Sequence, residues 1–294
     1  DYPDISPVVP TTVGNGVFVS YNDFVQLGEF GGLPDYGQGN EIVSWYKTDK
    51  YERLLTKARE WYQAGYILPG AATNQEAPTA LVKSGRGAGY ICSSIPGLVA
   101  GESRRTGREL VMIDLIEPYV TTSDLQLATW GIPRSSDNPE KAMQMLNLMY
   151  TDPEVANTLV FGVEGEHFKF DNNDRALVME DGGYDVTSVK FLLGNHFLLH
   201  LTPGEPDDLY EQYKELNENA YKPKLGFIFN QSSVKTEIAA LQAVREEFAV
   251  ALESGQVNPD NILPQFRKRL EEAGLEKVLD EKQRQLDKWL ENNK

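Results

Sequence analysis

The amino-acid sequence predicts an α/β fold that ends in a mostly helical region. Between residues 49 and 133, segments with helical periodicity alternate with short apolar runs typical of strands. Beyond residue 189, amphipathic segments follow one another with few strand signals. Because 294 residues exceed what one compact core usually holds, we expect two lobes, or one domain with an appendage.

The first predicted helix runs from Asp49 to the stop signal at Gly65. Apolar side chains recur there at three- and four-residue spacing: Tyr51, Leu54, Leu55, Ala58, Trp61 and Tyr62. The preceding forty residues are rich in Gly and Pro, and residues 17–19 are the only plausible strand among them.

Strands and helices are then expected in alternation. A helical segment at 77–83 leads through small residues into a strand that ends near Cys92, and further strands are predicted at 109–116 and 127–133. Asn138 and Asp152 each precede a proline and a glutamate, which is the pattern of a capping residue, a first-turn proline and an acid at the positive helix end.

The remaining chain reads as a hairpin followed by helices. Glycines and the polar turn at 171–174 separate short apolar stretches between residues 160 and 179. Helices are predicted at roughly 207–219, 233–253, 258–273 and 275–292. The longest carries an apolar stripe that must pack against something: Ile238, Leu241, Val244, Phe248 and Leu252.

Composition excludes several classes of partner. Acidic residues outnumber basic ones 44 to 28, and no continuous basic stripe occurs, so we expect neither nucleic acid nor an anionic membrane surface as a partner. The single cysteine, Cys92, excludes an intrachain disulfide and a cysteine-rich metal cluster. No apolar run approaches the ~20 residues that span a bilayer, and the abrupt start at Asp1 looks like a cut inside a larger protein.

Three motifs in order resemble the family 1 extracellular solute-binding proteins: Leu81 to Ala88, Trp130 to Pro133, and Asn138 to Ala142. Further motifs resemble a Gram-positive, lipoprotein-type subset of sugar-binding proteins that carries a C-terminal domain of unknown function: Gly162 to Phe168, Gly194 to Phe197, Leu225 to Asn230 and Val234 to Ala240. The chain departs from that subset at Phe168, His196 and Asn230, where Tyr, Gln and Asp are usual.

The resemblance covers roughly the C-terminal three fifths of a family member. It implies a periplasmic-binding-protein-like (type II) two-lobe fold, present in part. Residues 1–112 would be the remainder of the second α/β lobe, 113–188 the return segment to the first lobe, and 189–294 the helical domain. It also implies an extracellular, monomeric ABC-importer component without cofactor or metal, which binds a carbohydrate, meets permease subunits, and touches the membrane only through a lipid anchor absent from this chain.

Sugar binding requires flat apolar faces against the pyranose C–H surface and planar polar groups that bridge hydroxyls. Trp130 at the predicted hinge crossing and Tyr90 on the opposite crossing are the candidate rings, although core packing explains large aromatic residues equally well. Ser93 and Trp45 also belong to the predicted ligand-binding set.

Glu164, Glu166 and His167 lie in a glycine-flanked turn, where side chains can project without covering a core. A carboxylate there can accept sugar hydroxyl protons without chemistry, so these residues are candidate ligand contacts. The alternative functions are a glycoside hydrolase that uses Glu164 or Glu166, for which no second acid can be placed, and an interaction module whose helical tail docks a membrane partner.

Metal and nucleotide sites find little support. His196 and His200 share a face in either periodicity, but a third zinc ligand is missing. The 171–174 turn hints at a calcium loop, yet its central glycine is absent. The glycines at 85, 87 and 89 lack the spacing of phosphate-binding motifs, so we do not expect a nucleotide site. The family resemblance implies a non-catalytic protein that captures and delivers sugar.

Overall fold

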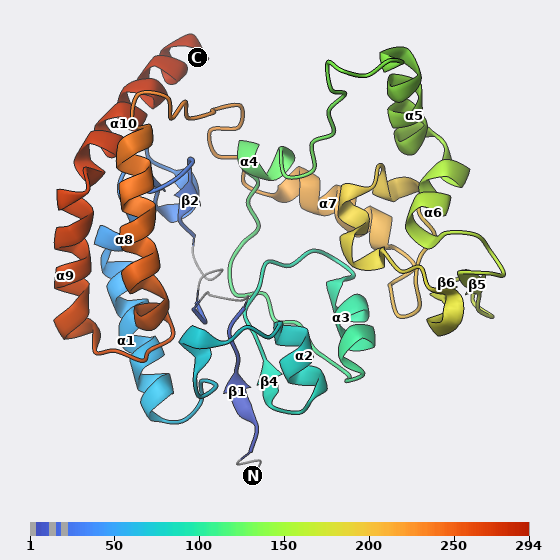
Figure 1. Cartoon of the computed structure of the whole chain (residues 1–294), viewed down its shortest axis with the longest axis horizontal. Helices are drawn as coiled ribbons and strands as arrows, with labels where there is room; N and C mark the ends of the chain where they lie inside the picture. Colours follow the sequence, from blue (N-terminus) through green and yellow to red (C-terminus); the bar gives the residue numbers. More distant parts are fainter. Residues whose placement is uncertain (1–3, 12–15, 19–22, 294) are drawn as a thin grey trace. The chain divides into compact units, whose positions relative to one another are not determined.

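The computed structural model describes residues 4–11, 16–18 and 23–293 of the chain (Figure 1). They form two compact units, the first from residues within 1–94, 105–124 and 219–294, and the second from 95–104 and 125–218. These units are defined by which residues pack together. The sequence instead predicts a division into lobes at residues 112 and 188, and that division stays a prediction.

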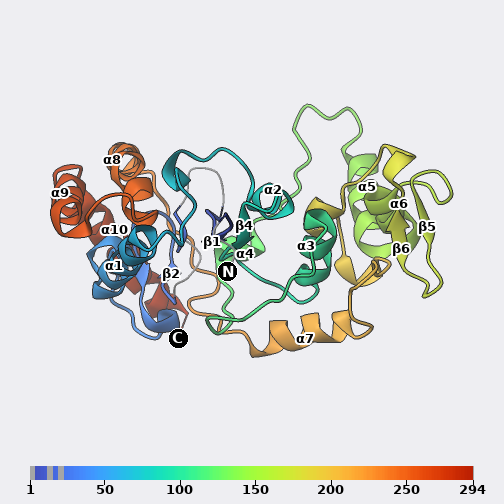
Figure 2. The ribbon, with the colours of Figure 1, turned by 90° about the horizontal axis from the view of Figure 1, so that it is seen from below.

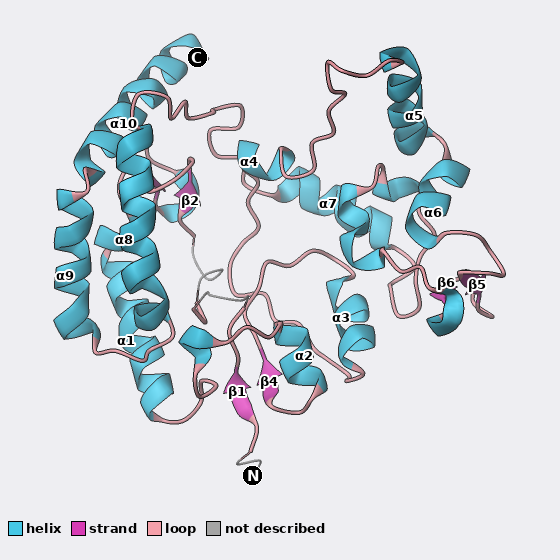
Figure 3. Cartoon of the chain, viewed as in Figure 1, coloured by secondary structure: helices cyan, strands magenta, loops and turns pink. Residues whose placement is uncertain are grey.

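Helices predominate and the strands are short (Figure 3). The helices are α1 (Asp49–Gln63), α2 (Pro78–Lys83), α3 (Leu98–Thr106), α4 (Thr122–Leu125), α5 (Pro139–Thr151), α6 (Pro153–Phe161), α7 (Leu209–Asn219), α8 (Lys235–Glu253), α9 (Pro259–Glu272) and α10 (Leu275–Asn292). The strands are β1 (Ser6–Val8), β2 (Val25–Gln26), β3 (Gly32–Leu33), β4 (Gly87–Gly89), β5 (Phe168–Phe170) and β6 (Ala176–Val178). The predicted helices of the tail are confirmed.

Each strand of the described chain pairs with one other strand. β1 and β4 are parallel, whereas β2 with β3 and β5 with β6 are antiparallel. A β-carbon on Gly87 would lie 2.4 Å from the Val9 side chain, so the small residues of β4 allow close approach of the two chain segments.

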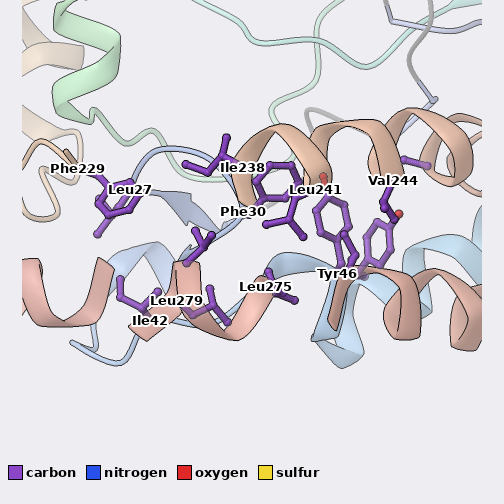
Figure 4. Packing of buried hydrophobic residues seen from close by; sticks show 14 of the residues in the cluster. Leu27, Phe30, Ile42, Tyr46, Phe229, Ile238, Leu241, Val244, Leu275 and Leu279 are labelled. Atoms are coloured by element: carbon purple, nitrogen blue, oxygen red, sulfur yellow. The ribbon is translucent and has the colours of Figure 1, made fainter. Parts of the chain in front are cut away.

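The first unit is built around a bundle of α1, α8, α9 and α10, which lie side by side in both views (Figures 1 and 2). Figure 4 shows part of the core, where side chains from the α8 and α10 helices meet those of the segment between residues 27 and 46. The predicted apolar stripe of α8 is confirmed, because Ile238, Leu241, Val244 and Leu252 are buried and Phe248 packs against them.

One charged side chain lies inside this core. Lys282 of α10 is 0% exposed, and its Nζ donates to the carbonyl oxygens of Glu29 at 2.6 Å and Gly31 at 2.8 Å. The ammonium also lies 4.8 Å from the centre of the Phe229 ring. Desolvation lowers the pKa of Lys282 to about 7, against a smaller opposing effect of the Glu29 carboxylate.

Tight backbone contacts hold α8 against α1. Gly255, just after α8, has a φ of 73°, and a β-carbon there would lie 2.2 Å from the Ala58 carbonyl oxygen. Arg59 Nη1 donates to the carbonyl oxygens of Gly255 and Gln256 at 3.0 and 2.9 Å. At the same end of α8, the partly buried Glu253 accepts a 3.1 Å hydrogen bond from the Tyr51 hydroxyl.

The second unit contains α5, α6 and the β5–β6 hairpin that the sequence predicts. The Asp152 side chain caps α6 by accepting from the amides of Glu154 at 2.9 Å and Val155 at 3.2 Å. Asn138 precedes α5 without a side-chain capping bond, so only one of the two predicted caps forms. The hairpin turn is closed by Asp171 Oδ1, which accepts two backbone amide protons.

Two predicted strands are wrong. Residues 109–116 and 127–133 belong to no strand, and Val111 is 85% exposed. An apolar run becomes a strand only where a neighbour offers hydrogen-bond partners, and no described segment pairs with either run. Val17 and Phe18 form a bend instead of the predicted strand, and Val19 lies outside the described residues.

Candidate functional site

Trp130 lies in irregular chain before α5, within the second unit. Its indole Nε1 donates to the Leu192 carbonyl oxygen at 2.8 Å, and the side chain is 47% exposed. The hydrogen bond holds one edge of the ring while much of its surface stays open to solvent. This combination suits a ring that receives a ligand, because the ring is oriented before contact.

The turn between α6 and β5 places its three predicted site residues differently. His167 Nδ1 accepts from the Val163 amide at 2.9 Å, and the imidazole packs edge-on against Tyr184 with ring centres 5.6 Å apart. A β-carbon on Gly162 would lie 2.8 Å from the His167 ring, so that glycine makes room for it. Histidine therefore shapes the turn, while Glu164 and Glu166 remain exposed and able to reach a ligand.

Tyr90 and Ser93 follow β4 in the first unit. Tyr90 is half-buried, and burial, with a smaller effect of the Cys92 thiol, raises the pKa of its hydroxyl. Ser93 is exposed in irregular chain. Tyr90 thus presents a protonated hydroxyl at neutral pH, which can both donate and accept a hydrogen bond.

Trp45 packs in the first unit. Its ring centre lies 5.5 Å from that of Phe24 and 5.6 Å from that of Tyr51, and the side chain is partly buried against the largest core cluster. Packing accounts for this tryptophan. The predicted residues are therefore divided between the units, with positions 45, 90 and 93 in the first and 130, 164, 166 and 167 in the second.

A cluster of tyrosines in the first unit was not predicted from the sequence. Tyr36 and Tyr221 stack with ring centres 5.2 Å apart and planes at 24°, and Tyr119 meets Tyr36 edge-on at 6.3 Å. Tyr221 is 47% exposed. A backbone bridge between residues 119 and 221 brings these positions together, and their separation along the chain leaves no sequence signal.

The backbone under Tyr36 is unusual. Asp35, Tyr36 and Gly37 have consecutive positive φ angles of 48°, 55° and 73°. Only glycine adopts this region without strain, and each of the other two residues costs roughly 1–2 kcal/mol. The Tyr36 amide donates to the Asp23 carbonyl oxygen at 2.8 Å, and its hydroxyl accepts from the Glu117 amide at 3.1 Å. Hydrogen bonds therefore hold both the backbone amide and the hydroxyl of Tyr36 in place.

The described residues hold no cluster of three or more His, Cys, Asp or Glu side chains suited to a metal ion. His196 packs near Tyr213, and His200 packs edge-on against Phe170 with ring centres 4.8 Å apart. Burial lowers the pKa of both imidazoles. Of the helices in the described chain, none combines the length and the apolar character that a bilayer span requires.

Comparison with known proteins gives the context of these residues. The N-glycan transport solute binding protein NgtS from Streptococcus pneumoniae matches with a TM-score of 0.83 at 26% identity, over 99% of this chain and 65% of that one. The chain has the fold of a solute-binding protein. The complex of NgtS with Man5GlcNAc matches this chain with a TM-score of 0.80 at 26% identity, over the same shares of both chains. The predicted partial, type II two-lobe fold class is thus confirmed.

Sequence comparison agrees with the fold. The chain is 31% identical over 302 aligned positions to a carbohydrate ABC transporter substrate-binding protein of Streptococcus pneumoniae serotype 4 (strain ATCC BAA-334 / TIGR4). The alignment covers 98% of this chain. The chain spans 60% of the length of that relative. Residues 223–291 match a family described as a domain of unknown function, DUF3502. The predicted resemblance to sugar-binding proteins with such a domain is confirmed.

Proposed function

We propose that the chain is part of the extracellular carbohydrate-binding component of an ABC importer, which captures a saccharide and delivers it unchanged to permease subunits. The names and bound sugars of the solute-binding relatives support this proposal. As in the sequence prediction, the full-length protein is a monomer held at the cell surface by a lipid anchor. The proposed lobes retain the predicted boundaries at residues 112 and 188.

The observation that carries the proposal is Trp130. A pyranose ring offers a C–H face that packs on an indole, and it gains most when the indole is already oriented. The bond from Nε1 to the Leu192 carbonyl supplies that orientation, and the 47% exposure leaves surface for the sugar. Glu164 and Glu166 in the same unit offer carboxylates that accept hydrogen bonds from sugar hydroxyls.

Most of the other proposed contacts lie in the first unit. Tyr90 and Ser93 supply hydroxyls that donate to and accept from sugar hydroxyls, and Trp45 of the same unit stays in the proposed set. His167 of the second unit completes the set beside Glu164 and Glu166 in the chain. The stacked tyrosines at 36 and 221 add a second aromatic surface, since Tyr221 is half exposed and its ring stacks on that of Tyr36.

Calorimetric titration with Man1GlcNAc and Man5GlcNAc, the sugars bound in the NgtS complexes, tests the proposal. We expect the chain to bind at least one of them, and Trp130→Ala to weaken that binding by about tenfold, equivalent to about 1.4 kcal/mol. Leu127→Ala is the matched control, because Leu127 is an exposed apolar residue of the same segment. Unchanged affinity in the Trp130 variant, or no binding of either sugar, would contradict the proposal.

The absence of catalysis is tested separately. A hydrolase needs two carboxyl groups held about 5 to 10 Å apart across one glycosidic bond. We expect the chain to return both oligosaccharides intact after prolonged incubation, as measured by mass spectrometry. Release of a shorter sugar that disappears in Glu164→Gln or Glu166→Gln would support the hydrolase alternative instead.

A further inference from the structure

A groove in the first unit lies between the loop at residues 227–233 and the helix α10. Its volume of about 460 Å³ falls within the range of small-molecule sites, roughly 300–1,000 Å³. Almost all of its lining belongs to the DUF3502 match at residues 223–291. The groove contains none of the residues assigned above to sugar capture.

One wall of the groove is apolar. Trp289 and the buried Phe227 meet edge-on, with ring centres 6.1 Å apart and planes at 76°. Ile228 beside them is 61% exposed. A β-carbon on Gly226 would lie 3.6 Å from the Trp289 ring, so the loop runs directly against the indole. The wall therefore offers a ring and an aliphatic side chain that water reaches.

The loop and helix are tied together by reciprocal bonds. Gln285 Oε1 accepts from the Asn230 amide, and Gln285 Nε2 donates to the Asn230 carbonyl oxygen, both at 2.9 Å. Glu281 accepts from Arg284 Nε at 2.8 Å, Arg284 Nη2 at 2.7 Å and Gln285 Nε2 at 2.7 Å. These bonds, with Arg284 first, lower the pKa of Glu281 to about 2, so the carboxylate stays ionised and paired.

Other donors along the groove remain uncommitted. Within the described residues, Asn230 Nδ2, Lys288 Nζ and Trp289 Nε1 have no hydrogen-bond partner in the protein. Asn230 Oδ1 accepts from the Ser232 amide, which holds the amide group with its nitrogen free. The groove thus presents a surplus of hydrogen-bond donors next to an aromatic ring.

The charge of the groove is the reverse of the charge of the chain. Arg284 and Lys288 line it with Glu281 as the only acid, which leaves one uncompensated positive charge in a protein of net charge -16. A ligand that complements this surface carries acceptors, a negative charge and a C–H face. We propose that this groove is a second saccharide site, which binds an acidic sugar through Asn230, Lys288 and Trp289.

A saccharide fits this groove better than a peptide does. Bound peptides use an exposed strand edge or a long apolar groove with several side-chain pockets. Here the lining consists of side chains from one loop and one helix, and its apolar part is limited to two rings and one isoleucine. Sugar hydroxyls and a carboxylate accept from amide, ammonium and indole donors, while the ring face packs on Trp289.

Calorimetry on the whole chain with a trimer of galacturonic acid tests the proposal. The methyl-esterified trimer is the neutral control, because it keeps the same rings and hydroxyls. We expect the acid to bind at least about tenfold more tightly than the ester, and less tightly as salt is raised. Triglutamate, a peptide of equal charge, should bind at least tenfold more weakly than the acidic trimer.

The variants locate the site. Lys288→Gln and Asn230→Ala should each weaken binding of the acidic trimer by about tenfold, and Trp289→Phe, which keeps a ring but removes the N–H donor, by about threefold to tenfold. Lys268→Gln, at an exposed lysine of α9, is the matched control and should bind normally. Trp130→Ala should also bind normally, which separates this groove from the proposed capture residues.

Three results would overturn the proposal: no binding of the acidic trimer by the unmodified chain, triglutamate binding as tightly as the trimer, or a loss of binding in Trp130→Ala without one in Lys288→Gln. The last result would place the acidic sugar at Trp130 and leave the proposed capture function standing. Conversely, failure of Man1GlcNAc and Man5GlcNAc to bind would not affect the groove.

Discussion

Replacing Lys282 with methionine tests the energetics of the buried amine. Lys282 is fully enclosed, and its pKa in the folded chain is about 7, against about 10 for an unfolded lysine. Between these two values the unfolded chain binds one more proton than the folded chain. The stability contribution of Lys282 therefore rises with pH from about 7 towards 10 and is lost as the pH falls.

The magnitude follows from the size of the pKa shift. Each pH unit in that window changes the free energy of unfolding by about 1.4 kcal/mol. Methionine keeps the length of the side chain and removes the charge, but it leaves the carbonyl oxygens of Glu29 and Gly31 without their donor. That loss costs about 1–3 kcal/mol at every pH. Relative to the unmodified chain, Lys282→Met should gain about 3 kcal/mol as the pH falls from 9.5 to 7.

Urea unfolding followed by far-ultraviolet circular dichroism at several pH values measures this difference. Lys268→Met provides the matched control, because Lys268 is an exposed lysine that pairs with Glu272 on the helix surface and should show no such pH dependence. If the stability difference between Lys282→Met and the unmodified chain stays constant from pH 7 to 9.5, the buried amine keeps its proton and the reasoning is refuted.

Three further predictions concern stability, and urea unfolding measures each of them. Burial raises the pKa of Glu253 to about 7, so its contribution to stability is present below about pH 4.5 and is lost as the pH rises to 7. Glu253→Gln should therefore lose no stability over this pH range on account of position 253. A pH profile of stability identical to that of the unmodified chain would contradict this expectation. Gly255→Ala should cost about 3 kcal/mol or more because of the Ala58 carbonyl, whereas Gly65→Ala, with a similar φ and no atom within 4 Å, should cost only about 1 kcal/mol. Equal costs at the two glycines would show that the contact is unimportant. Asp152→Ala should cost about 1 kcal/mol through loss of the α6 cap, and a change below a few tenths would argue against the cap.

Local sequence patterns predicted the helices well. The three- and four-residue spacing in α1 and α8, and the proline-led starts of α5 and α6, depend on neighbours along the chain. The runs at 109–116 and 127–133 failed as strands because pairing depends on a partner elsewhere, which an apolar run alone does not reveal.

The candidate site was predictable only in part. Trp130 could be predicted as a candidate ring, but its orientation could not. The indole is oriented by a hydrogen bond to the backbone carbonyl oxygen of Leu192, and no pattern of side chains in the sequence identifies a backbone acceptor. The stacking of Tyr36 on Tyr221 arises from a backbone bridge between distant segments and from positive φ angles at two non-glycine residues. Neither the bridge nor these angles follow from local propensity. Trp45, by contrast, is partly buried against the first unit's core, and its role as a ligand contact stays a prediction.

The largest core joins the two extremes of the described chain. Side chains between Val25 and Leu55 share one apolar cluster with those between Phe227 and Leu286. The domain match at residues 223–291 consequently contributes only part of this core, and the rest comes from the early segment. If residues 223–291 were expressed alone, their apolar helix faces would be exposed to water and the fragment would aggregate. If a separate peptide with residues 25–55 were added, the two pieces would bind each other through the same apolar faces.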